Sequence, residues 1–212
     1  MDILYVHPAK QEVDARFDKF RACSPYPFIP MGVIGLANLL RSEAWEVVGL
    51  NLPLELTLQP DFSLRTWLAG QPPAKMVLID LHWYEHCFGA IDVARAVKSI
   101  WPSTVTVIGG LTTSNFAEEI LSSHPEVDYA IRGDAEEPLR QLARHVFGGD
   151  VDLAAIPNLV RRTGNAVQQN PRSYFASPDD LDRLDFVSTD WLLHAQSYGA
   201  IQYSGAGMIR LQ

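Results

Sequence analysis

Hydrophobic positions in the first 150 residues alternate between two spacings. Short β-rich runs predict five strands, at Asp2–His7, Glu46–Asn51, Met76–Asp80, Val105–Ile108 and Tyr129–Arg132. Between them, apolar residues recur at intervals near 3.6, which predicts helices over Met31–Arg41, Asp61–Ala69, Gly89–Ile100, Asn115–His124 and Glu136–Phe147. Strands and helices that alternate in this way form a parallel sheet with helices on both faces. The sequence therefore predicts an α/β, flavodoxin-like (Rossmann-like) doubly wound domain with a five-stranded parallel sheet.

The pattern changes after Gly148 and Gly149. Asn158–Arg162 and Ala166–Gln168 flank Thr163-Gly164-Asn165, which is the pattern of a small β-hairpin. The stretch Asn170–Asp190 is rich in Pro, Asp and Ser and predicts a linker that packs along a surface. We therefore expect an α/β domain over residues 1–150, followed by a hairpin and linker over residues 151–212.

Composition limits the class of protein. With 47% apolar and 20% charged residues the chain can bury a core, which excludes general disorder. Seventeen basic residues against 25 acidic ones give a net charge of −8, which argues against bulk capture of nucleic acid or an anionic membrane. No apolar run approaches the roughly 18–20 residues of a membrane span. The start, MDILYVHPAK, lacks the features of a secretory signal, so we expect a cytoplasmic location.

Two cysteines, Cys23 and Cys87, are too few for a disulfide framework or a Cys-rich zinc site. Ligands of doubly wound sheets bind at the carboxyl ends of the strands, so the loops at that edge are the places to look for chemistry. The first of these loops, Pro8–Pro30, is unusually long, which is typical of a functional loop. Its basic residues are interpreted either as a solvated face or as a contact for an anionic ligand tail; they are Arg16, Lys19 and Arg21.

The densest chemistry follows the third predicted strand, in the segment Asp80–Gly89 (DLHWYEHCFG). Two histidines, two carboxylates, a thiol and three aromatic residues stand there between a buried strand and a helix. Aromatic residues so close together favour a flat or apolar ligand that covers them. The alternative is that they pack under neighbouring loops while the polar residues cap the helix. A metal site built from Asp80, His82 and His86 is a third interpretation, because the i, i+4 spacing of the histidines suits a helix face.

Glycine-containing turns end the next two strands. Gly109 and Gly110 precede Leu111-Thr112-Thr113-Ser114, and paired glycines allow a ligand to approach the backbone, although they also serve plain turns. Neither GxxxxGK[ST] nor GxGxxG follows a strand, which disfavours a phosphate loop or a dinucleotide site. Gly133 and Asp134 end the fifth strand, where Asp134 is expected either to cap the next helix or to have a direct catalytic role.

Longer stretches resemble one known family. PMGVIGLANLLRSEAWEVVGLNLP resembles the opening helix and second strand of the cobalamin (B12)-binding N-terminal domain of B12-binding-domain radical S-adenosylmethionine (radical SAM) proteins. VTVIGGLTTSNFAEEILSSHPEVDYAIRGDAEEPLRQL is similar to the Gly-Gly strand and fifth strand of that domain. IPNLVRR followed by DDLDRLDF resembles the link into the radical SAM barrel. The resemblance implies a cobalamin held flat on the carboxyl edge of the sheet, with its nucleotide tail beside Gly109 and Gly110.

The resemblance also implies a set of cofactor contacts. The corrin ring would lie on aromatic residues of the Asp80–Gly89 segment, and this segment and the double-glycine turn would lie side by side and enclose the cofactor together. The expected contacts are Asp80, His82, Trp83, Tyr84, His86, Gly89, Gly109, Gly110, Leu111, Thr112, Thr113, Gly133 and Asp134. No catalytic residue is assigned, and no metal ligand apart from His7, which is considered as an axial ligand to cobalt.

Three features depart from the family pattern. The DxHxxG motif that supplies an axial histidine in related domains is missing after the first strand. Asp80 and His82 stand where a small hydroxyl residue and an apolar residue are usual. The CxxxCxxC motif is also absent, so we expect the barrel that carries a 4Fe-4S cluster and S-adenosylmethionine to lie elsewhere, in the same longer chain or in a separate protein.

The resemblance implies a cobalamin-binding domain that serves radical methyl transfer or a related reaction on a small-molecule or peptide substrate, with no nucleic-acid or membrane partner. The departures at Asp80 and His82 motivate an alternative, a degenerate, cofactor-free scaffold of the same fold that docks a barrel or a substrate protein. A stand-alone corrinoid carrier is a weaker alternative, because the DxHxxG motif is missing.

Overall fold

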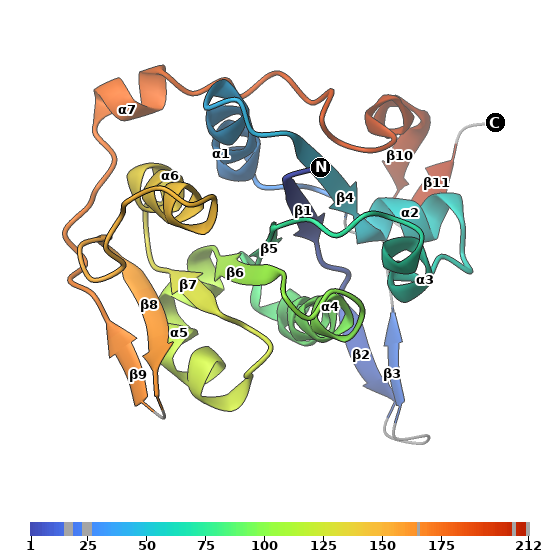
Figure 1. Cartoon of the computed structure of the whole chain (residues 1–212). Helices are drawn as coiled ribbons and strands as arrows, with labels where there is room; N and C mark the ends of the chain where they lie inside the picture. Colours follow the sequence, from blue (N-terminus) through green and yellow to red (C-terminus); the bar gives the residue numbers. More distant parts are fainter. Residues whose placement is uncertain (15–18, 23–26, 165, 205–206, 211–212) are drawn as a thin grey trace.

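A seven-stranded sheet forms the centre of the molecule (Figure 1). The structure is a computed structural model that describes residues 1–14, 19–22, 27–164, 166–204 and 207–210. The strand order is β4-β1-β5-β6-β7-β8-β9. Five strands are mutually parallel, namely β1 (Ile3–His7), β4 (Val47–Asn51), β5 (Met76–Asp80), β6 (Val105–Gly109) and β7 (Tyr129–Ile131). Their order is that of a flavodoxin-like doubly wound sheet.

The prediction of a five-stranded sheet is wrong in one respect, because the predicted hairpin is part of the sheet. Its strands, β8 (Leu159–Thr163) and β9 (Ala166–Gln169), are antiparallel, and β8 pairs with β7. Without β8, strand β7 would be an edge with unpaired backbone groups beside a buried core. The hairpin satisfies those groups and moves the edge outward to a strand whose side chains are mostly exposed.

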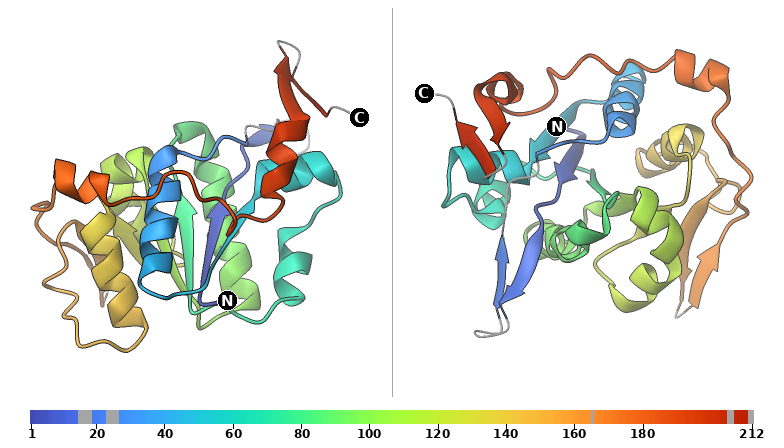
Figure 2. Two further views of the ribbon diagram at one scale, coloured as in Figure 1. Left: turned by 90° about the horizontal axis from the view of Figure 1, so that it is seen from above. Right: turned by 180° about the vertical axis from the view of Figure 1, so that it is seen from behind.

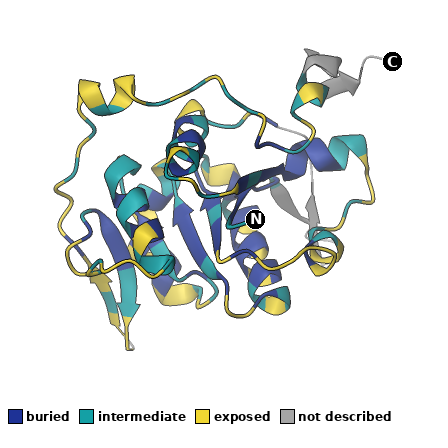
Figure 3. Ribbon diagram, turned by 45° about the horizontal axis from the view of Figure 1, so that its top comes forward, coloured by how far each residue is buried: buried dark blue, intermediate teal, exposed yellow. Residues whose placement is uncertain are grey.

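Helices cover both faces of the sheet (Figure 2). One face carries α1 (Met31–Ser42) and α6 (Glu136–Val146), and the other carries α3 (Leu64–Ala69), α4 (Cys87–Ile100) and α5 (Leu111–Ser123). The alternating side chains of the strands supply both halves of the core, so that the central strands are buried in Figure 3. No helix in the described part of the chain is both long and apolar enough to cross a membrane.

Several connections differ from their predictions. A helix that was not predicted, α2 (Leu52–Leu58), follows β4 directly, and α5 begins four residues before the expected Asn115. The predicted Pro8–Pro30 loop contains a two-stranded hairpin, β2 (Gln11–Asp14) and β3 (Lys19–Ala22). Near the other end of the chain, a short 3₁₀ helix (Ala195–Ala200) precedes the paired strands β10 (Ile201–Ser204) and β11 (Gly207–Arg210). Arg16 and Cys23 lie outside the described residues.

The segment that follows the hairpin crosses the α1/α6 face as a strap, which we define as residues 170–193 (Figure 1). It contains the short helix α7 (Pro178–Asp182). The Asn38 side chain of α1 donates hydrogen bonds to the carbonyls of Asp185 and Ser188, both at 2.8 Å. At its far end, the Trp191 carbonyl accepts a 2.8 Å hydrogen bond from the amide of Gly49, where any side chain would overlap the Trp191 ring. The strap therefore contacts the domain through residues on both sides of α7, whereas α7 itself has no buried residue.

Candidate functional site

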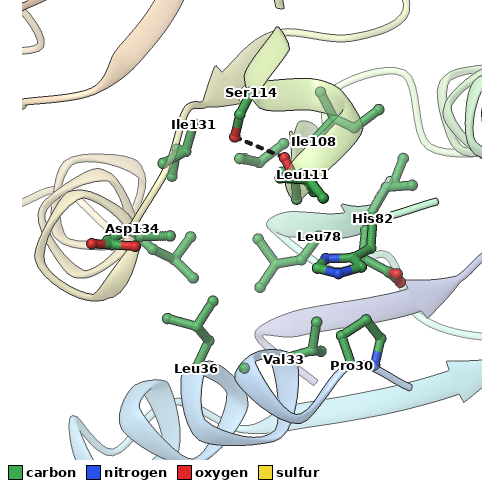
Figure 4. A pocket seen from close by; sticks show the side chains of 18 of the residues that line it. Pro30, Val33, Leu36, Leu78, His82, Ile108, Leu111, Ser114, Ile131 and Asp134 are labelled. Carbon is green, nitrogen blue, oxygen red and sulfur yellow. Dashed lines mark hydrogen bonds between the residues drawn. The ribbon is translucent and has the colours of Figure 1, made fainter. Parts of the chain in front are cut away.

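A cavity of about 410 Å³ opens at the carboxyl edge of the sheet, on the face covered by α1 and α6 (Figure 4). This volume lies within the range of small-molecule pockets. The floor is formed by strand residues and the two sides by the first turns of α1 and α6; the apolar lining includes Val33, Leu36, Leu78, Val107, Ile108, Ile131 and Leu139. Gly32 lies at the mouth, and a Cβ added there would meet no atom within 4 Å. Small residues in α1 therefore leave space between the helices that larger side chains would fill.

The double-glycine turn and the turn that follows β5 lie in direct contact. The amide of Leu81 donates to the Gly109 carbonyl at 2.7 Å, and the Thr112 amide donates to the Leu81 carbonyl at 3.1 Å. Gly110 has a φ of +109°, and a Cβ there would lie 2.8 Å from the Leu81 carbonyl. Gly110 therefore serves close backbone packing. The turns lie side by side as expected, but the cavity opens next to Gly109 and Gly110 toward α6 and not between the two turns.

A buried polar network lies where β1 and β5 end. The Asp80 carboxylate accepts a 2.6 Å hydrogen bond from the Tyr5 hydroxyl, and the Nδ1 atom of His7 lies 2.9 Å from the same oxygen. Burial, together with the negative charge of Asp80, holds the pKa of Tyr5 well above its usual value. The Nε2 atom of His7 is buried and has no hydrogen-bond partner in the described part of the chain.

Histidine and tryptophan rings pack around His7. The Trp83 ring lies edge-on to His7 at 6.1 Å, and the His86 ring lies edge-on at 5.2 Å, between ring centres. Burial, with a smaller contribution from His7, lowers the pKa of His86 to about 4. His7 is itself fully buried beside these rings, so its Nε2 cannot contact a group outside the protein surface in this conformation. His7 as an axial cobalt ligand thus stays a prediction.

The aromatic residues of the Asp80–Gly89 segment do not share one surface. Trp83 contacts the rings of His7, His82 and His86, whereas Tyr84 is 72% exposed and Phe88 is 49% exposed. The segment forms a short 3₁₀ helix (Tyr84–His86) that leads directly into α4, which turns neighbouring residues in different directions. In the described part of the chain, no group of three or more His, Cys, Asp or Glu side chains has the arrangement of a metal site, so the interpretation as a metal site finds no support.

The expected cofactor contacts divide into two groups. Those that line the cavity are Asp80, His82, Gly109, Gly110, Leu111, Gly133 and Asp134. Those that lie outside the lining are Trp83, Tyr84, His86, Gly89, Thr112 and Thr113. Three of the second group have structural contacts instead. A side chain at Gly89 would overlap the Ala9 carbonyl, the Thr112 hydroxyl donates to the His82 carbonyl at 3.0 Å, and the Thr113 hydroxyl donates to the Gly109 carbonyl at 3.2 Å.

Sequence reasoning missed several residues of the lining. Ser114 joins the two glycine turns, because its hydroxyl donates to the Gly110 carbonyl and accepts from the Gly133 amide, both at 2.8 Å. Arg172 reaches the cavity from the strap, and Glu136 from the first turn of α6. Burial raises the pKa of Glu136, whose Oε2 atom has no hydrogen-bond partner in the described part of the chain. No periodic signal in the sequence could have placed Arg172 there, because the strap folds back over the domain.

Comparison with known proteins connects this site to a family. The family described as the B12 binding domain matches residues 19–143. The radical S-adenosylmethionine methyltransferase TsrM from Kitasatospora setae, solved with cobalamin and a [4Fe-4S] cluster bound, has a TM-score of 0.61 and 20% identity over 84% of this chain and 30% of its own. The cobalamin-dependent S-adenosylmethionine radical enzyme OxsB, solved with aqua-cobalamin and S-adenosylmethionine bound, has a TM-score of 0.58 and 16% identity over 82% of this chain and 22% of its own.

No curated protein sequence matches the chain. At these identities the two solved structures show a common fold, and the chain spans less than one third of either enzyme. The family match runs from β3 through most of α6 and includes the glycine turns and the flanks of the cavity. Since it covers more than half of the residues, this chain belongs to the B12-binding domain family.

Proposed function

We propose that the chain binds cobalamin at the carboxyl edge of its sheet and holds the nucleotide tail in the cavity between α1 and α6. The observation that carries this proposal is the position of the cavity, which opens beside Gly109 and Gly110 at the ligand-binding edge of a doubly wound sheet. The base at the end of the tail is a flat, largely apolar ring. It fits a slot of about 410 Å³ whose walls are mostly aliphatic side chains, such as Val33, Leu36 and Leu78.

The rim of the same edge suits a large, flat group. Tyr84 and Phe88 are exposed near the start of α4, and Leu111 is exposed at the start of α5. Exposed apolar side chains gathered at one edge favour contact with a ligand or a partner surface over contact with water. The corrin ring would lie against this rim, while Trp83 and His86, which pack on His7, would support it from within the protein.

When bound, cobalamin supplies a cobalt centre that carries a methyl group. The residues of this chain hold the tail, orient the ring and exclude water from one side of it. Asp80 fixes the orientation of His7, and that network stands below the rim where related domains carry a small hydroxyl residue. We propose that Asp80 and His7, in place of the missing DxHxxG motif, would form part of the protein environment next to the bound cofactor.

The remaining parts of the reaction lie outside these 212 residues. With two cysteines and no CxxxCxxC motif, these residues cannot hold a 4Fe-4S cluster of the radical SAM type. We propose that a radical SAM barrel, in the same longer chain or in a separate protein, supplies the cluster and S-adenosylmethionine for radical methyl transfer or a related reaction on a small-molecule or peptide substrate. The printed descriptions of TsrM and OxsB support this pairing.

Titration with hydroxocobalamin tests the proposal, with Gly32 as the site of the variants. Gly32→Trp should place an indole ring at the mouth of the cavity, because a Cβ at Gly32 meets no atom within 4 Å, and Gly32→Ala is its matched control. We expect wild type and Gly32→Ala to shift the visible bands and co-elute with the corrinoid, and Gly32→Trp to do neither while keeping its far-UV circular dichroism. A wild-type protein that stays colourless would reject cobalamin binding and favour the cofactor-free scaffold. Undiminished binding by Gly32→Trp would reject this location of the tail.

A further inference from the structure

The charged groups around the cavity differ in whether they have hydrogen-bond or ion-pair partners. Asp80 is bound by Tyr5 and His7, and the Asp134 carboxylate accepts a 2.9 Å hydrogen bond from the Ala176 amide. Arg172 is the only lysine or arginine in the lining, and it forms no hydrogen bond or ion pair within the described part of the chain. A guanidinium at the mouth of a cavity, with five donors and no anionic partner, is suited to bind an oxyanion of a ligand.

The backbone on both sides of Arg172 is held in place. The side chain of Asn170 donates to the carbonyls of Leu153 and Ile156, both at 2.7 Å, and the Asn158 amide donates to the Pro171 carbonyl at 3.0 Å. On the other side, the Tyr174 amide donates to the Asn158 side chain at 3.2 Å. Arg172 therefore extends from a short segment whose neighbours are anchored to the domain.

The guanidinium of Arg172 lies against the backbone of Gly133. A Cβ on Gly133 would lie 2.7 Å from Nη2 of Arg172, so a larger residue there would displace the guanidinium. Ser114 connects Gly133 to Gly110 through its hydroxyl, which places Arg172 next to the first turn of α5.

A second group at the mouth accepts hydrogen bonds. Glu136 lines the cavity, and its buried Oε2 atom has no hydrogen-bond partner in the described residues. Buried polar atoms are usually paired, and the Glu136 carboxylate, which lines the cavity, keeps acceptor capacity for a ligand hydroxyl. A cation and a carboxylate that line one cavity together match the phosphate ester of a sugar that keeps a free hydroxyl group.

We infer that Arg172 binds the phosphodiester of the nucleotide tail and that Glu136 accepts a hydrogen bond from its ribose. This inference rests on the proposed function. It divides recognition between two parts of the chain, because the apolar slot belongs to the domain that the family match covers, whereas Arg172 lies beyond residue 143. The strap would therefore distinguish complete cobalamin from a corrinoid that lacks the tail.

Two corrinoids test this inference. Hydroxocobalamin carries the phosphodiester and ribose, whereas dicyanocobinamide lacks both. Arg172→Gln should weaken hydroxocobalamin binding by about 10- to 100-fold, the effect of a lost charged hydrogen bond, and leave dicyanocobinamide binding unchanged. Arg172→Lys should lie between the two, because it keeps the charge and loses the planar fork of donors. Arg183→Gln, an exposed arginine on the same strap outside the lining, is the matched control and should bind as wild type does.

The salt dependence of binding provides a second measurement. The dissociation constant of wild type for hydroxocobalamin should rise with salt, and that of Arg172→Gln should rise less steeply. If Arg172→Gln loses the same affinity for both corrinoids, or loses none, the role of Arg172 is overturned. The proposal that the chain binds cobalamin would still stand. Failure of wild type to bind either corrinoid would overturn the proposed function, and the inference with it.

Discussion

Replacement of Asp80 by alanine should destabilise the fold strongly, because its carboxylate is the shared acceptor for two buried donors. The Tyr5 hydroxyl lies at 2.6 Å and the His7 Nδ1 atom at 2.9 Å. The exposed fractions of Tyr5, His7 and Asp80 are 2%, 0% and 5%. Without the carboxylate, both donors would stay buried without a partner, at a cost of about 1–3 kcal/mol each. The substitution also removes the free-energy cost of burying the Asp80 carboxylate, which offsets part of this loss. We expect a loss of about 2–5 kcal/mol in the free energy of unfolding.

A double-mutant cycle separates the network from other effects of the substitution. Tyr5→Phe removes one donor and should lower the free energy of unfolding by about 1–3 kcal/mol. The double variant Tyr5→Phe/Asp80→Ala should cost about 1–2 kcal/mol less than the two single variants together, because the hydrogen bond can be lost only once. Asp134→Ala is the control, since this aspartate also lines the cavity but makes one exposed hydrogen bond, and it should change stability by less than about 1 kcal/mol.

Urea unfolding followed by circular dichroism measures the free energy of unfolding of wild type and of the four variants. An Asp80→Ala variant within about 0.5 kcal/mol of wild type, or strictly additive effects of the two substitutions, would refute the network as a source of stability. The same variants also address the cofactor. If Asp80 acts on bound cobalamin and not on the fold, Asp80→Ala should lose corrinoid affinity with an unchanged unfolding curve.

Two further predictions concern the buried histidine and the strap. Burial lowers the pKa of His86 to about 4 from 6.5, so the folded state binds fewer protons than the unfolded state between these values, and stability that is present above pH 6.5 should be lost as the pH falls toward 4. Between pH 7 and pH 4, the free energy of unfolding of His86→Phe should fall by about 1–3 kcal/mol less than that of wild type, a range that allows for solvent screening. Identical pH profiles of the two proteins in urea unfolding would contradict this. Trp191→Ala should lower the free energy of unfolding by about 3–5 kcal/mol, because the buried ring packs on Tyr5 and Gly49. Val187→Ala, at an 85% exposed position of the strap, should change it by less than about 0.5 kcal/mol, and similar effects of the two in thermal or urea unfolding would contradict an anchoring role for Trp191.

The sequence predicted the parts of the fold that repeat with a fixed period. All five parallel strands lie within two residues of their predicted bounds, because central strands buried on both faces are nearly continuous apolar runs. Helix α2 was missed although it carries two local signals, a side chain of Asn51 that accepts from the Leu54 amide and a proline, Pro53, in its first turn. Seven residues are too few to show a helical period, so only the capping pattern could have identified this helix.

The site was predicted less completely, for a physical reason. The rule that ligands bind at the carboxyl ends of strands selected the correct loops, and Gly109, Gly110 and Gly133 line the cavity that it led to. The direction of each side chain in the Trp83–Gly89 segment depends on how a 3₁₀ turn joins α4, and composition does not determine this. Both sides of the cavity come from helices whose existence was predicted but whose spacing depends on tertiary packing. The position of Arg172 depends on the path of the strap, whose sequence has no hydrophobic period.

Direct contacts connect the strap to the cavity by two routes. At one end, Asn170 fixes the segment that carries Arg172 to the mouth. At the other, the Trp191 ring packs edge-on against Tyr5 at 5.8 Å between ring centres, and Tyr5 donates to Asp80 in the cavity lining. A strap that left the domain surface would therefore remove a cation from the mouth and a buried ring from beside the polar network. Because Arg172 lies beyond the region that the family match covers, the cavity is lined both by the domain and by the segment that follows it.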